Sequence, residues 1–241
     1  MIHSLFVKDI SRGALTPLLS ICKPVAALLF AAGLAVTLSG CSSDTSSPRF
    51  TATGYIADQG MMRIWRKDDA KHQPLAIMSV YSPLKGKGTI VSYYAYQDGN
   101  LNLVRQTIQG GEKDVLELRL DEKGELSYMQ RQIGDQRQLL TPDDIARSQY
   151  QSRHMVEISE ALRVGNVRLI QGRWENSRFT SCAGETQSLK LEDWQLKWIE
   201  SRASHSSLPL GIAWLDAPEG QQLLLVANED FCSWEPTVDT L

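Results

Sequence analysis

The sequence predicts an α+β protein: mostly an antiparallel β meander that forms a curved sheet, with two helices and a disulfide-braced C-terminal part. Short β-type segments separated by turn residues fill positions 50–133. Two later stretches carry helix-start signals, and two cysteines lie in the last third of the chain. The composition, 42% hydrophobic and 22% charged over 241 residues, is that of an ordinary globular protein.

Residues 1–40 are predicted to be a secretion signal. The uncharged stretch 25–38 has 14 residues, whereas a membrane-spanning helix needs about 20 and a signal-peptide core about 7 to 15. It leads into a lipobox pattern, an apolar residue and two small residues before a cysteine: Leu38, Ser39, Gly40 and Cys41. Cys41 is therefore predicted to carry acyl chains such as palmitate. An ordinary signal peptide with a coincidental cysteine and a retained signal anchor stay as alternatives.

The residue after the lipidated cysteine indicates whether the lipoprotein is sorted to the inner or the outer membrane. Aspartate at this position retains enterobacterial lipoproteins in the inner membrane, and here the residue is Ser42, which favours the outer membrane. Residues 41–49 are read as the lipidated cysteine with a flexible polar tether. Residues 50–241 are read as a single periplasmic α+β domain. The expected partners are the membrane, through the lipid anchor, and the lipoprotein processing and sorting machinery.

The meander rests on segments rich in β-branched and aromatic residues, joined by turns such as Asp98-Gly99-Asn100. Connections this short cannot make parallel crossovers, so neighbouring strands should be antiparallel. Tyrosines on both faces of 89–96 leave open which face is the core. The expected strands are 50–56, 61–65, 75–81, 89–96, 101–108, 115–120 and 126–133.

The first helix is expected over 142–164. Thr141 is a suitable N-cap, Pro142 suits the first helical position, and Asp143 and Asp144 face the positive helix end. Gly165 suits the helix stop. The later elements are strands at 167–174 and 178–182, a helix at 191–204, and strands at 208–215 and 221–227.

Two of the four cysteines remain for the mature domain, because Cys22 leaves with the leader and Cys41 is lipidated. In an oxidising compartment, Cys182 and Cys232 are expected to form a disulfide. A redox pair is the alternative, and it lacks the usual CxxC spacing.

Charge and motifs exclude several functions. Without residues 1–41, which hold three basic side chains and one acidic one, 22 basic and 27 acidic side chains remain, a net charge of -5. Such a domain is repelled by nucleic acid.

His72, His154 and His205 show no metal-binding spacing, so no metal and no cofactor are expected. GxSxG is absent, and only the stretch His205-Ser206-Ser207 suggests a hidden hydrolase triad.

Tryptophan is concentrated near the C-terminus, at Trp174, Trp194, Trp198, Trp214 and Trp234. These rings are possible contact aromatics for an acyl chain, a peptide or a glycan. The alternative is a C-terminal core built on large aromatics.

The domain resembles the YjaH-like lipoprotein family of enterobacteria (DUF1481), which has no assigned activity. The matching stretches are 54–58 (GYIAD), 64–66 (IWR), 79–83 (SVYSP), 129–132 (MQRQ), 207–220 (SLPLGIAWLDAPEG) and 223–236 (LLLVANEDFCSWEP). The resemblance supports the lipoprotein assignment and provides no catalytic residues.

The leading functional hypothesis is therefore a non-enzymatic envelope interaction module, anchored in the outer membrane, with an envelope protein as its partner. The alternative is a carrier that holds an apolar ligand in a cavity of the curved sheet. The remote alternative is a hydrolase.

The lipobox makes a direct prediction. Cys41→Ala should leave the protein unlipidated or unprocessed, because the thiol is the acceptor of the diacylglyceryl group. Mass spectrometry of the mature N-terminus checks this, and an unmodified Cys41 in the native protein would contradict it. Ser42→Asp should move the protein to the inner membrane in a sucrose-gradient separation.

Overall fold

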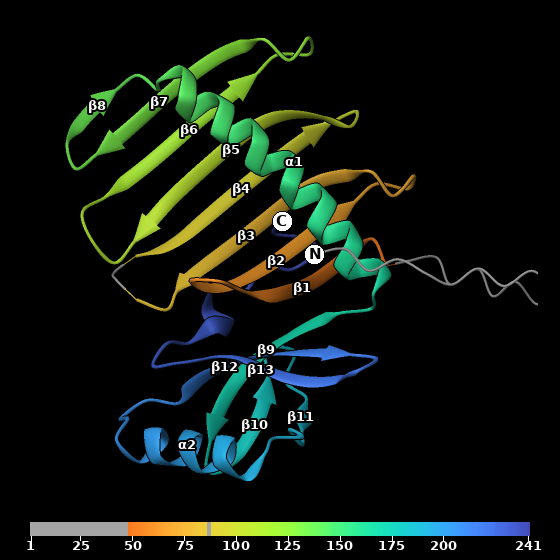
Figure 1. The fold of residues 1–241 in the computed structure, drawn as a ribbon, viewed down its shortest axis with the longest axis vertical. Coiled ribbons are helices and arrows are strands. Elements are labelled where there is room, and N and C mark those ends of the chain that lie inside the picture. Colours follow the sequence, from red (N-terminus) through yellow and green to blue (C-terminus); the bar gives the residue numbers. More distant parts are fainter. Residues whose placement is uncertain (1–47, 86–87) are drawn as a thin grey trace, which may run out of the picture. The chain divides into compact units, whose positions relative to one another are not determined.

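The computed structural model describes residues 48–85 and 88–241 (Figure 1). The leader, the lipobox, Cys41 and Ser42 lie outside the described residues, so those predictions stay predictions. The two sheets and two helices described below belong to one compact unit that runs to Leu241. Within the described ranges, no helix is long and apolar enough to cross a membrane.

The first sheet is an antiparallel meander in which the strands stand in sequence order. This confirms the predicted meander and adds a short last strand. At the β4–β5 turn, Asp98 and Gly99 both have positive φ, of 50° and 79°, as a two-residue hairpin of type I′ requires. The strands are β1 Phe50–Ala57, β2 Gly60–Asp68, β3 Pro74–Pro83, β4 Thr89–Gln97, β5 Asn100–Gln109, β6 Asp114–Leu120, β7 Leu126–Ile133 and β8 Gln136–Gln138.

The C-terminal strands form a second, separate antiparallel sheet in the order β11-β10-β9-β12-β13. The sequence predicted four of these strands but not that they leave the meander. Strand β12 returns after a helix and pairs with β9, which places two distant chain segments side by side. The strands are β9 Arg168–Glu175, β10 Arg178–Ser181, β11 Thr186–Gln187, β12 Leu210–Ala217 and β13 Gly220–Ala227.

Both predicted helices form. Helix α1, Pro142–Val164, begins with the expected cap: the hydroxyl of Thr141 accepts from the backbone N–H of Asp144, and the Asp144 side chain accepts from the N–H of Thr141. Helix α2, Asp193–Ser204, begins two residues later than predicted, because Glu192 is its N-cap. A short 3-10 helix, η1, covers Phe231–Ser233.

Helix α1 lies across one face of the meander (Figure 1). Its contact face holds Met155 and three buried serines, Ser148, Ser152 and Ser159, so the helix approaches the sheet closely. The hydroxyl of Tyr96 donates to the carbonyl of Ser152 at 3.1 Å. The core beneath the helix consists of Ile64, Ile77, Tyr94, Tyr96, Val104, Leu116, Leu118, Leu140 and Met155.

A buried arginine also fastens α1 to the sheet. Arg66, 3% exposed, pairs through Nε with Asp68 at 2.7 Å and through Nη1 with Glu160 of α1 at 3.2 Å. The same Nη1 donates to the hydroxyl of Ser159 at 3.1 Å. The guanidinium is thus paired on both sides, as a buried charge must be.

The second sheet packs against the opposite face of the first strands of the meander. Neighbouring residues of β2 point to opposite faces, so Ile64 lies under α1 while Trp65 enters the core between the sheets. Strands β1 to β3 are therefore covered on both faces. The buried residues between the sheets are Trp65, Val80, Leu169, Ala213, Leu215, Leu224 and Phe231.

Arg63 is the polar centre of this second core, with 1% of its surface exposed. Its Nη1 donates to Gln171 of β9 at 2.8 Å, and its Nη2 donates to the hydroxyl of Ser82 at 3.1 Å. The guanidinium lies 4.6 Å from the ring centre of Phe231 and 4.9 Å from that of Trp234. One side chain thus joins the meander, the second sheet and the C-terminal segment.

Arg63→Ala should lower the free energy of unfolding by about 2–5 kcal/mol, because it leaves a cavity in a packed core and deprives the buried side chains of Gln171 and Ser82 of a hydrogen-bond donor. Arg105→Ala, which removes a half-exposed arginine paired with Glu117, should cost about 1 kcal/mol or less. Urea unfolding measures both. Arg63→Lys, which keeps the charge and loses the planar fork, should fall between them. Equal losses for the two alanine variants would contradict this account.

Candidate functional site

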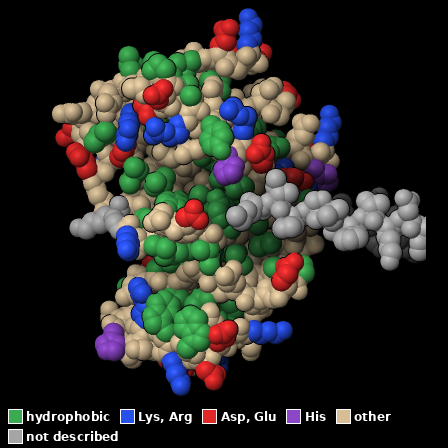
Figure 2. All heavy atoms as spheres, viewed as in Figure 1, with side chains coloured by type: hydrophobic (Ala, Val, Ile, Leu, Met, Phe, Trp, Pro, Cys, Tyr) green, Lys and Arg blue, Asp and Glu red, His purple; other side chains and the backbone are tan. Residues whose placement is uncertain are grey.

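Two of the five C-terminal tryptophans are exposed on α2. Trp194 is 63% exposed and Trp198 45% exposed, one helical turn apart on the same side of the helix. The fully buried Ile199 fixes α2 to the second sheet through the core that includes Leu210 and Ile212. Figure 2 shows hydrophobic side chains gathered on the surface at the lower end of the view, where α2 and the second sheet lie. We call Trp194 and Trp198 the α2 aromatic pair.

Polar neighbours hold this pair in place. The indole N–H of Trp194 donates to the carboxylate of Glu192. The guanidinium of Arg202 lies 5.8 Å from the ring centre of Trp198, and its Nε donates to Asn228 at 3.0 Å. These contacts hold the two rings in defined positions, and a surface that is ordered in advance binds at a lower entropic cost.

The other three tryptophans pack into or against the hydrophobic cores. Trp174 and Trp214 are 6% and 1% exposed, and both belong to the core beneath α2. Trp234 is half-buried, with its ring edge-on to that of Trp65 at 5.7 Å. Core packing thus accounts for these three, and the predicted contact aromatics reduce to the α2 aromatic pair.

The predicted disulfide between Cys182 and Cys232 is confirmed. It ties the segment after β10 to η1, across a sequence separation of 50 residues. Asp230 strengthens this junction, since it accepts from the N–H of Cys232 at 3.1 Å and pairs with Arg173 at 2.7 Å. The bridge holds the segment that stacks Phe231 and Trp234 on Arg63.

Glu235 lies beside the disulfide, partly buried. Burial raises the pKa of its carboxyl, and the neighbouring Gln171, Trp65 and Arg63 oppose this shift. The buried nitrogens Gln171 Nε2 and Trp65 Nε1 face the carboxylate, although neither makes a hydrogen bond of normal geometry.

The carboxylate of Glu235 lies within 4.8 Å of both disulfide sulfurs, and this is the one trio of potential metal ligands in the described part of the chain. Bonded sulfurs are not thiolates, so the trio lacks the donors that a metal needs.

His205 and His154 have local partners. In residues 48–85 and 88–241, the hydrogen bonds of His205 go to the carbonyl of Ser201 and the hydroxyl of Ser204, at 2.7 and 3.1 Å. The hydroxyl of Ser206 donates to a backbone carbonyl two residues on. His154 stacks on Tyr150, an exposed residue of α1. These contacts do not form the orienting acid–histidine–serine chain of a hydrolase triad.

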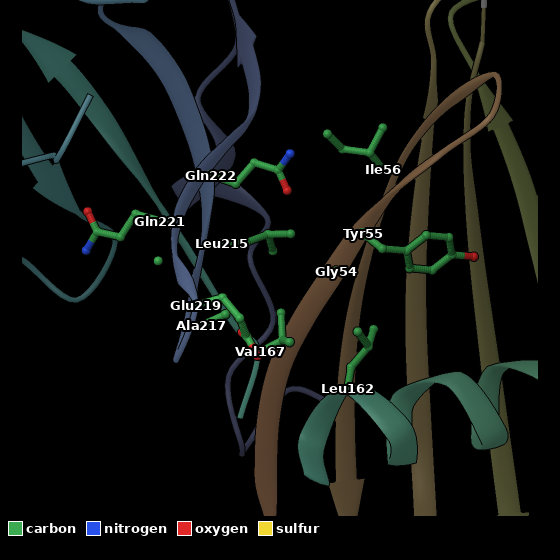
Figure 3. Close-up of a pocket in the computed structure, with 11 residues that line it drawn as sticks. Gly54, Tyr55, Ile56, Leu162, Val167, Leu215, Ala217, Glu219, Gln221 and Gln222 are labelled. Atoms are coloured by element: carbon green, nitrogen blue, oxygen red, sulfur yellow. The ribbon is translucent and has the colours of Figure 1, made fainter. Parts of the chain in front are cut away.

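Core side chains of the described residues fill the space between α1 and the meander. Two hollows lie elsewhere on the described residues. One, of about 650 Å³, is lined mostly by polar residues at the β4–β5 and β6–β7 turns. The other, of about 460 Å³, lies between β1 and the β12–β13 hairpin (Figure 3). The carrier alternative stays a prediction.

Similar proteins extend over nearly the whole chain. Residues 52–237 match the family described as "Protein of unknown function (DUF1481)". The chain is 39% identical over 236 residues to the uncharacterized protein YjaH of Escherichia coli (strain K12), which covers 97% of this chain and 100% of that relative. No solved structure matches it. The family resemblance seen in the sequence is thus confirmed.

Glu235 gives a pH prediction. Its folded-state pKa lies above the ordinary 4.5, so the folded protein takes up this proton at a higher pH than the unfolded chain. As the pH falls from above the raised pKa to 4.5, the wild type should gain stability relative to Glu235→Gln. Below 4.5 the difference should stay constant. Denaturant unfolding at a series of pH values checks this, with the exposed Glu122→Gln as a control that shows no such trend. Parallel curves for wild type and Glu235→Gln would contradict it.

Proposed function

Because the chain belongs to the DUF1481 family of proteins of unknown function, we propose its role from its own residues. It is a lipoprotein of the outer membrane that faces the periplasm and acts by binding another envelope protein, without catalysis. The α2 aromatic pair is the contact surface.

The sequence supports the anchor. The lipobox ends at Cys41, and β1 begins at Phe50, nine residues later. Fully extended, these nine residues span about 30 Å. Two acyl chains already hold a protein stably on a membrane. The tether therefore lets the domain meet partners close to the membrane surface.

The α2 aromatic pair is the observation that carries the binding role. Tryptophan and arginine dominate binding hot spots, since they bury much surface or make directed contacts at low entropic cost. Here Trp194, Trp198 and Arg202 follow one stripe of α2 at intervals of four residues. Core packing does not explain why two neighbouring tryptophans stay exposed to water. A binding surface explains it, because a partner would cover them.

Site-specific photocrosslinking tests this proposal in intact cells. A photoreactive residue in place of Trp198 should give a discrete crosslinked product, and the same residue in place of Tyr150, an exposed aromatic of α1, should not. Adding Trp194→Ala should reduce the product about tenfold or more, as for a hot-spot residue.

Folding is the control for this experiment, because exposed substitutions change stability by about 0.5 kcal/mol or less. The thermal midpoint of Trp194→Ala should therefore match that of the wild type. Equal crosslinking from positions 198 and 150, or a product that survives Trp194→Ala at full yield, would refute the α2 contact.

A further inference from the structure

The hollow between β1 and the β12–β13 hairpin is an apolar groove. Figure 3 shows three apolar side chains pointing into it: Leu162 from α1, Val167 from the loop before β9, and Leu215 from β12. Ile56 lies at its rim and is 51% exposed. The volume, about 460 Å³, falls within the roughly 300–1,000 Å³ typical of small-molecule sites.

The groove has a solid floor and an open mouth. A Cβ on Gly54 would lie 2.5 Å from the carbonyl of Met62 on the neighbouring strand β2, so only glycine fits at this position, and it would also lie 3.3 Å from Leu224 of the second sheet. Strands β1 and β13 are each the outermost strand of their sheet, so no further strand of the described chain covers the mouth. The apolar residues at the rim are therefore exposed to water unless a ligand covers them.

The groove carries one charge. Glu219, in the turn between β12 and β13, is the single ionisable carboxylate that lines it. Glu219 is exposed and takes part in none of the ion pairs among the described residues. The nearby Asp216 is already paired with Arg168, and Gln221 is occupied by Asp216 and the backbone of Lys190. Glu219 thus offers a free negative charge beside an apolar slot.

We propose that this groove binds a cationic amphiphile: an apolar tail between Leu162, Val167 and Leu215, and a positively charged head at Glu219. The charge complementarity selects the head group, and the apolar walls select the tail. This groove is separate from the α2 aromatic pair, so the proposed ligand site does not depend on the proposed protein contact at α2.

Titration calorimetry of the mature protein with dodecyltrimethylammonium, below its micelle concentration, tests the proposal. The expected result is saturable binding to one site, with a rise of the thermal midpoint, as for any ligand that prefers the folded state. Dodecyl sulfate has the same tail and an anionic head, and it should bind more weakly.

Two variants separate head from tail. Glu219→Gln should weaken binding of the cationic probe about two- to fivefold, the range for a solvent-exposed ion pair, and should remove its advantage over dodecyl sulfate. Ile56→Ser should weaken both probes about threefold or more, because it removes apolar contact area. Glu122→Gln, in a distant turn, is the matched control and should change neither affinity.

The proposal would be overturned by equal affinity for the two head groups, by affinities that Glu219→Gln and Ile56→Ser leave unchanged, or by a lowered thermal midpoint that shows general detergent unfolding. Tight binding of an extended basic peptide without binding of the amphiphile would likewise reject a small-molecule site.

Discussion

The buried guanidinium of Arg63 is the interaction on which the rest of the structure depends. It lies between two sheets that share no hydrogen-bonded strands, and it contacts both of them as well as the C-terminal segment. A charge in such a place is costly unless it is compensated, and two of its nitrogens, Nη1 and Nη2, donate hydrogen bonds while Nε has no partner among the described residues. Burial lowers the pKa of Arg63 to about 10, against the opposing charges of Glu229 and Glu235. The aromatic rings and amide around it are the compensation for that cost.

The disulfide makes this arrangement persistent. Without it, the rings of Phe231 and Trp234 would belong to a chain end that pairs with no strand. A bridge that closes a loop of this length is worth about 2–4 kcal/mol, mostly by restricting the unfolded chain. The C-terminal segment is thus held as part of the inter-sheet core. The second sheet then gives α2 a fixed platform, from which the α2 aromatic pair faces water.

Local chemistry allowed much of this fold to be predicted. The cap at Thr141, the hairpin at Asp98-Gly99 and the pairing of Cys182 with Cys232 follow from short-range rules or from elimination. The separation into two sheets could not be predicted, because strand alternation does not show which sheet a strand joins. The burial of Arg63 could not be predicted either, because an arginine in a strand reads as exposed until Gln171, 108 residues away, and the C-terminal rings are in place. The five tryptophans looked alike in sequence, and only packing separates Trp198 from Trp214.

Hydroxyl-radical footprinting read by mass spectrometry tests most directly whether α2 is the working surface. In the purified protein, Trp194, Trp198 and Tyr150 should all be oxidised, because all three are exposed. In isolated cell envelopes, oxidation of Trp194 and Trp198 should fall strongly while that of Tyr150 stays the same. Equal oxidation of the α2 aromatic pair in both preparations would contradict the claim that the protein acts through this face.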